Sequence, residues 1–147
     1  MPAVFPVWDH IPPIHWVVLR PGEMARERSA RILVVDDDPA IAATVSEILK
    51  DEGYAVLIAR DGAEAMQLLG GSAGAIDLIL LDMRMPGMDG WAFAAAYRQL
   101  PGPHAPLVTM TAAQSAHAWA QEIDAQGVLA KPFELPDLLR IVERFTA

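Results

Sequence analysis

Five side chains fall at the ends of short apolar runs in this sequence. Asp36 and Asp37 follow ILVV, Asp82 follows LILL, Thr111 ends VTMT and Lys131 follows VLA. Carboxylates held a few ångströms apart repel by roughly 4 kcal/mol per pair at an effective dielectric constant of ~20, so such a group needs cations. Oxygen ligands without His or Cys suit Mg²⁺. Phosphoryl transfer onto a carboxylate uses Mg²⁺ beside the accepting aspartate, together with Lys and Thr side chains that hold the transferring group.

The elements that would position these residues follow a regular order from residue 31 onward. Short β-branched apolar runs predict strands at residues 31–35, 54–59, 76–81, 106–110 and 127–130. Their near-continuous apolarity is typical of strands covered on both faces, so we expect them to be mostly buried. Segments of helical period separate them, and this alternation favours a parallel five-stranded sheet with helices on both faces. The sequence therefore predicts an α/β, doubly wound (βα)5 fold with right-handed crossovers.

Apolar residues at helical spacing predict the five helices. Their stripes are Ile41, Val45, Ile48 and Leu49; Ala65, Leu68 and Leu69; Phe93, Tyr97 and Leu100; Ala116, Trp119, Ala120 and Ile123; and Leu135, Leu138, Leu139 and Val142. Trp119 is accordingly predicted to lie in the core rather than to anchor a partner. Asp38, which precedes Pro39, is predicted to cap the first helix rather than to bind metal, and Asp89 to cap the third.

The five candidate residues all stand at predicted carboxyl ends of strands, where open doubly wound sheets bind their ligands. We expect them to converge on one edge of the sheet. Each has a plainer explanation on its own: a solvated charge at a strand end, a surface lysine, or a threonine that caps the fourth helix. Their joint placement favours a site.

Four segments carry a resemblance to a known family. ILVVDDDP, LILLDMRMPGMDGW, VTMTA and LAKPFE resemble, in order and spacing, the four signatures of the response regulator receiver domain of two-component signalling. The resemblance covers about residues 30–147. It implies a flavodoxin-like, CheY-like sheet with the strand order 2-1-3-4-5.

The resemblance also implies roles for the acidic residues. Asp82 corresponds to the phosphoacceptor, the nucleophile toward the phosphohistidine of a partner kinase. Asp36 and Asp37 correspond to the acidic pair that holds Mg²⁺. Asp82 itself and the backbone carbonyl of Arg84 correspond to the remaining metal ligands from the protein.

The resemblance implies further roles for residues of the last two signatures. Thr111 and the amide of Ala112 correspond to groups that meet the phosphoryl oxygens, and Lys131 to the lysine that pairs with the acceptor or its phosphoryl group. Pro132 is expected to follow a cis peptide bond. Receivers usually carry Tyr or Phe three residues before that lysine, where this chain has Val128. We therefore expect phosphorylation to persist and its readout to use another group.

The function that follows is a signalling phosphoacceptor that assists its own phosphorylation and dephosphorylation, rather than an enzyme. One alternative is a phosphatase of the haloacid dehalogenase type, which also uses an aspartate nucleophile, Mg²⁺, Thr and Lys. That family carries a second aspartate two residues after the nucleophile, where this chain has Arg84. The other alternative is a phosphate-independent interaction module, which the complete site disfavours.

Composition and net charge restrict the classes of partner that we expect. A net charge of −8 disfavours nucleic acid, whose binding depends on clustered Lys and Arg. The absence of cysteine excludes disulfides and thiolate metal sites, and no apolar run approaches the ~20 residues of a membrane span, so we expect a cytoplasmic protein. The expected partner is a sensor histidine kinase or a His-phosphotransfer protein. A homodimer through the fourth helix, fifth strand and fifth helix is also open.

Residues 1–29 do not fit the strand and helix alternation. They carry five prolines and one short apolar run, IHWVVL, and Met24 within them would be a natural start for the domain. We predict a loose or mis-assigned N-terminal extension, followed by the receiver domain at residues 30–147. An added edge strand at IHWVVL is the alternative. The chain ends soon after the fifth predicted helix, so we expect a stand-alone receiver or a fragment of a longer regulator.

Overall fold

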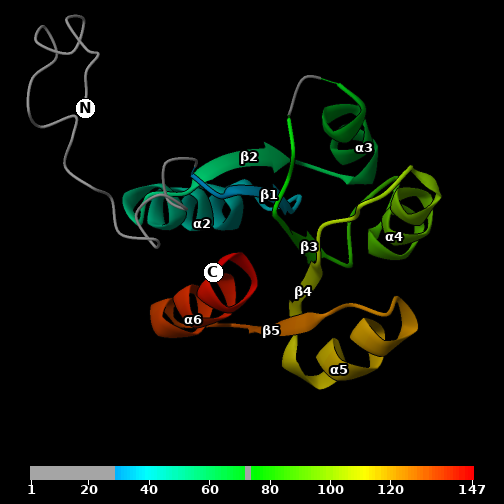
Figure 1. The fold of residues 1–147 in the computed structure, drawn as a ribbon. Helices are drawn as coiled ribbons and strands as arrows, with labels where there is room; N and C mark the ends of the chain where they lie inside the picture. Colours follow the sequence, from blue (N-terminus) through cyan, green and yellow to red (C-terminus); the bar gives the residue numbers. More distant parts are fainter. Residues whose placement is uncertain (1–28, 72–73) are drawn as a thin grey trace, which may run out of the picture.

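Five parallel strands form one sheet in a computed structural model that describes residues 29–71 and 74–147 (Figure 1). The strands are β1 (Arg31–Val35), β2 (Ala55–Ala59), β3 (Leu78–Asp82), β4 (Leu107–Ala112) and β5 (Gly127–Lys131). Their order in the sheet is β2-β1-β3-β4-β5. The predicted (βα)5 fold and its strand order are confirmed. Of the predicted N-terminal extension, residues 1–28 lie outside the described residues.

A helix follows each strand, and the helices form two layers around the sheet. They are α2 (Pro39–Asp51), α3 (Gly62–Gly70), α4 (Gly90–Gln99), α5 (Ala113–Glu122) and α6 (Leu135–Thr146). α2 and α6 cover one face, and α3, α4 and α5 cover the other (Figure 1). None of the helices in the described part of the chain is long and apolar enough to cross a membrane.

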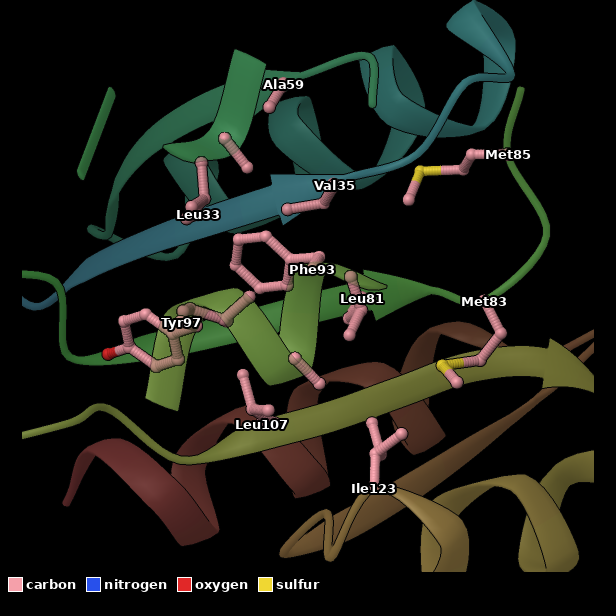
Figure 2. Close-up of a cluster of buried hydrophobic side chains, with 13 residues drawn as sticks. Leu33, Val35, Ala59, Leu81, Met83, Met85, Phe93, Tyr97, Leu107 and Ile123 are labelled. Atoms are coloured by element: carbon pink, nitrogen blue, oxygen red, sulfur yellow. The ribbon is translucent and has the colours of Figure 1, made fainter. Parts of the chain in front are cut away.

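Each face of the sheet has its own apolar core, because successive strand residues point to opposite faces. Under α2 and α6, the buried residues include Ile32, Val34, Leu80, Leu138 and Val142. On the other face, Phe93 and Tyr97 of α4 pack with Leu33, Val35 and Leu81 of the sheet (Figure 2). The two cores hold the central strands rigidly from both sides.

Burial differs between the central and the edge strands. β1 and β3 are almost wholly buried, whereas β2 and β5 are half-buried along most of their length. Ile58 of β2 is 39% exposed. The prediction that all five strands are mostly buried is therefore wrong for β2 and β5, because a strand at the edge of the sheet has a neighbour on one side alone.

β4 and β5 run further than predicted. Thr111 pairs with Ala130 and Ala112 with Lys131, so the ladder includes the residues that were expected just beyond the strands. α5 then begins directly at Ala113, with Ala112 in the cap position and no side-chain cap among the described residues. The alternative role of Thr111 as a helix cap is therefore wrong.

Gly90 fixes how closely α4 approaches the end of β3. A Cβ at this position would lie 2.7 Å from Cα of Met83 and 3.0 Å from the carbonyl oxygen of Asp82. We expect Gly90→Ala to displace this backbone and to lower the free energy of unfolding by about 1–3 kcal/mol, measured by urea denaturation. Gly70→Ala is the matched control, because its Cβ would face open space within the described structure. Equal stability of the two variants would contradict the close approach.

Candidate functional site

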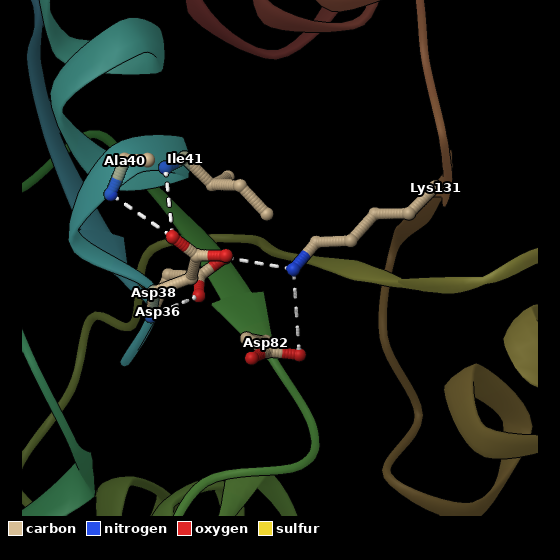
Figure 3. Close-up of polar contacts among 6 residues, drawn as sticks. All are labelled: Asp36, Asp38, Ala40, Ile41, Asp82 and Lys131. Carbon is tan, nitrogen blue, oxygen red and sulfur yellow. Dashed lines mark hydrogen bonds and ion pairs between the residues drawn. The ribbon is translucent and has the colours of Figure 1, made fainter.

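The carboxyl ends of β1, β3 and β5 bring three of the predicted residues to one edge of the sheet. Asp36 follows β1, while Asp82 and Lys131 are the last residues of β3 and β5. Oxygen atoms from Asp36, Asp37 and Asp82 lie within 4.8 Å of one another. The Asp36 and Asp82 side chains both extend toward the Lys131 ammonium (Figure 3). The predicted convergence of these four residues is therefore observed.

Lys131 balances part of this negative charge. Its Nζ donates to Oδ2 of Asp36 at 2.8 Å and lies 3.8 Å from Oδ1 of Asp82. The Asp36 side chain is fully buried and also accepts a hydrogen bond from the backbone N–H of Asp38 at 2.9 Å. The sequence did not indicate that Asp36 would be the nearer partner of Lys131. The peptide bond between Lys131 and Pro132 is cis, as the resemblance implies.

The three consecutive aspartates occupy different environments. Asp36 is buried against Lys131, whereas Asp37 is exposed at the edge of the sheet. Asp38 caps α2, because its side chain accepts hydrogen bonds from the backbone N–H groups of Ala40 at 2.9 Å and Ile41 at 3.2 Å (Figure 3). The predicted cap at Asp38 is confirmed, and so is the cap that Asp89 forms on α4.

Asp82 carries the clearest electrostatic perturbation. Burial and the nearby charge of Asp36 raise its pKa to about 7, although Lys131 and a hydrogen bond from the Arg84 backbone act in the opposite direction. Ionisation of Asp82 is therefore resisted in the protein alone, and a cation at this edge would favour it. The donor set is made of oxygens from three converging carboxylates, which fits Mg²⁺ and offers no soft ligand to thiophilic metals.

The raised pKa of Asp82 predicts a pH-dependent stability for the metal-free protein. Its pKa is about 7 in the folded chain and 3.8 in the reference state, so protonation of Asp82 favours folding. This contribution is fully present below pH 3.8 and is lost as the pH rises through about 7. We therefore expect the stability of the wild type, relative to Asp82→Asn, to fall by a few kcal/mol across that window. Urea denaturation in EDTA measures the difference, and a constant difference would contradict the raised pKa.

Three other predicted residues lie near this edge: Thr111 and Ala112 at the end of β4, and Arg84 in the loop after β3. Thr111 is 4% exposed and follows Met110, the β4 residue that pairs with Asp82. Ala112 is exposed and pairs with Lys131. The Arg84 side chain extends over the Trp119 ring of α5, with 5.0 Å between the guanidinium carbon and the ring centroid. The resemblance implies a role for the backbone carbonyl of Arg84, and no sequence pattern indicates this contact of its side chain.

An apolar groove of about 680 Å³ borders the acidic edge between α2 and α6. Lys131 lines one part of the groove. The apolar residues that line the groove include Ile41, Ile48, Phe133 and Leu135. Leu135 is 49% exposed and lines the groove. The groove could not be predicted from the sequence, because the helical spacing of Leu135 places it in the core-facing stripe of the last helix.

Known proteins are similar to this chain over the region that contains the acidic edge. Residues 32–143 match the family described as the response regulator receiver domain. Response regulator MprA of Mycobacterium ulcerans (strain Agy99) is 36% identical over 113 residues, which cover 76% of this chain and 47% of that protein. Transcription factor SKN7 of Chaetomium thermophilum is 32% identical over 129 residues, which cover 86% of this chain and 17% of that protein.

Solved structures of similar proteins share this fold. The chemotaxis response regulator CheY4 of Vibrio cholerae superposes with a TM-score of 0.72 at 34% sequence identity, and the match covers 80% of this chain and 98% of that chain. This chain spans about half the length of MprA and a smaller share of SKN7. The match to the family over most of the chain, together with the order of strands and the acidic edge, shows that the chain belongs to the response regulator receiver domain family of two-component signalling.

Proposed function

We propose that this domain is a phosphoacceptor, which takes a phosphoryl group from the phosphohistidine of a sensor histidine kinase or His-phosphotransfer protein onto Asp82. The observation that carries the proposal is the setting of Asp82 at the end of β3. Its carboxylate lies beside those of Asp36 and Asp37, and 3.8 Å from the ammonium of Lys131. A nucleophile, a metal-binding acidic pair and a cation for the phosphoryl group are thus together at one edge of the sheet.

The transfer follows from the chemistry of these groups. An Asp82 carboxylate oxygen forms a bond to phosphorus as the bond between phosphorus and the imidazole nitrogen breaks, and the imidazole keeps the electron pair. Lys131 stabilises the negative charge on the phosphoryl oxygens. The Thr111 hydroxyl and the Ala112 amide donate to those oxygens once the β4 end closes on them.

Metal binding belongs to the same proposal. Asp36, Asp37 and Asp82, with the backbone carbonyl of Arg84, would hold Mg²⁺. Bound there, Mg²⁺ would neutralise charge on the transferring group and its acceptor. The residues of the chain supply the remaining requirement, which is to hold the Asp82 carboxylate ionised and oriented against the donor.

A phosphatase of the haloacid dehalogenase type is the main competing function. It needs an acid–base residue two positions after the nucleophile, and this chain has Arg84 there, a side chain with N–H donors and no acceptor. We therefore expect no steady release of p-nitrophenol from p-nitrophenyl phosphate in the presence of Mg²⁺. Steady turnover that disappears in Asp82→Asn would replace the signalling proposal with the enzymatic one.

In a phosphate-independent interaction module, phosphorylation of Asp82 would have no effect on partner binding. Such a module would bind its partner equally well before and after treatment with acetyl phosphate and Mg²⁺. A phosphorylation switch instead requires binding to change on treatment of the wild type and to stay constant in Asp82→Asn.

We further propose that the partners of this domain are proteins. The apolar groove beside Lys131 is suited to the donor, because a donor must bring its phosphohistidine to Asp82 and the groove borders that site. The face formed by α5, β5 and α6 remains the proposed surface for output or for a second copy of the chain. SKN7 is named a transcription factor, so related domains occur in gene regulators, but the net charge of −8 argues against direct contact of this domain with nucleic acid.

A further inference from the structure

Arg84 joins the acceptor to α5. It lies two residues after Asp82, and its guanidinium carbon lies 5.0 Å from the centroid of the Trp119 ring on α5. The Arg84 side chain is exposed, so the contact with Trp119 is made at the surface of the molecule. Arg84 thus links the loop that follows the acceptor to α5, the helix that follows Thr111.

Trp119 is itself part of a cluster between α4 and α5. Its ring meets Trp91 of α4 edge to face, with centroids 4.9 Å apart and an interplanar angle of 67°. The Trp91 indole N–H donates to Oε1 of Glu122, also on α5, at 2.7 Å. We call Arg84, Trp91, Trp119 and Glu122 the tryptophan cluster. Trp119 was predicted to lie in the core, and it is instead partly buried at the margin of the core.

The rest of α5 is held by weaker contacts. The residues that the helix buries are Ala116 and Ala120, whose small side chains remove little apolar area from water. Between α5 and β5 lies a hollow of about 330 Å³, lined by His117, Ala120, Gln121 and Val128 among others. The tryptophan cluster therefore links α5 to α4, and the hollow borders the side of α5 that faces β5.

We propose that the Arg84 side chain is a latch, which holds α5 against α4 in the unphosphorylated protein and releases it when Asp82 is phosphorylated. This inference rests on the proposed function of Asp82. The phosphoryl group adds about two negative charges within reach of the guanidinium. Stacking of an exposed arginine on an indole is a weak contact, whereas charge-assisted hydrogen bonds to phosphoryl oxygens are strong. Arg84 then turns from Trp119 to the phosphoryl group, and α5 can shift toward the hollow beside Val128.

Fluorine NMR of protein labelled with 5-fluorotryptophan tests the latch. The chain has four tryptophans, and Trp119→Phe identifies the Trp119 resonance. Spectra are recorded before and after treatment with acetyl phosphate and Mg²⁺, and the intact mass of each sample reports phosphorylation. We expect the Trp119 resonance of the wild type to move on phosphorylation. In Arg84→Met the resonance of the untreated protein should already lie toward the phosphorylated position, and more than half of the further shift should be lost when the two proteins are compared at equal extents of phosphorylation.

Arg98→Met is the matched control. Arg98 also links α4 to the region after α5, through a hydrogen bond of 3.1 Å to the carbonyl oxygen of Asp124, but it is remote in sequence from the acceptor. It should keep the wild-type shift of Trp119. An equal loss in Arg98→Met, or a full shift in Arg84→Met, would overturn the latch and leave phosphorylation of Asp82 standing. Absence of an adduct in the wild type would overturn the proposed function, and the latch with it.

Discussion

Asp37→Ala is expected to abolish measurable binding of Mg²⁺ at millimolar concentrations. Asp36 is already paired with Lys131 at 2.8 Å, and burial raises the pKa of Asp82 to about 7, so both are less available to an incoming ion than Asp37 is. Asp37 is the exposed carboxylate of the group. Its removal takes away the ligand that can first attract the ion from solution. Isothermal titration calorimetry at constant ionic strength measures the loss.

Asp38→Ser provides the control for Asp37→Ala. Both variants remove one negative charge from the same three-residue segment, but serine can replace Asp38 as the cap of α2. We expect its affinity for Mg²⁺ to stay within about twofold of the wild type, because Asp38 faces the helix rather than the metal site. An equal loss of affinity in both variants would mean that Mg²⁺ responds to overall charge, and normal binding by Asp37→Ala would remove Asp37 from the site.

Lys131→Met is the second substitution with a large expected effect. Methionine keeps much of the length of lysine but leaves the fully buried Asp36 carboxylate without its partner. We expect the metal-free protein to lose about 2–4 kcal/mol of stability, somewhat less than a wholly buried pair would cost, because the Lys131 side chain is 21% exposed. Loss of the ammonium also raises the pKa of Asp82 further. Phosphorylation by acetyl phosphate at neutral pH should then fall sharply.

Lys50→Met controls for the loss of a lysine as such, since Lys50 is the only other lysine in the chain. Lys50 is exposed in the last turn of α2, so its replacement should cost at most about 1 kcal/mol and leave phosphorylation unchanged. Urea denaturation and intact mass measure the two effects. Equal stability of the two methionine variants would argue that Lys131 does not compensate the buried charge of Asp36.

The fold could be predicted because local pattern and topology agree along the chain. The apolar runs at β1 and β3 and the aspartates before α2 and α4 define the starts of elements, and the alternation of strands and helices then restricts the arrangement. Exposure of β2 and β5 could not be predicted in the same way. An edge strand differs from a central one in its neighbours, and the apolar sequence of Val56, Leu57 and Ile58 resembles that of a buried strand.

The site could be predicted to the level of which residues meet, because the carboxyl ends of parallel strands share one edge. The finer pairings depend on side-chain reach. Lys131 lies closer to Asp36, at 2.8 Å, than to Asp82, at 3.8 Å, and the order of residues along the chain does not indicate this preference. The contact of Arg84 with Trp119 joins a loop to a helix 35 positions later, and neither residue carries a local pattern that would indicate it.

Phosphorylation of Asp82 is tested most directly by the intact mass of the protein after incubation with acetyl phosphate and Mg²⁺. We expect a single adduct of ~80 Da per chain, which is absent in Asp82→Asn and absent when EDTA replaces Mg²⁺. The same adduct on Asp82→Asn would contradict the central claim, because the phosphoryl group would then reside on another residue.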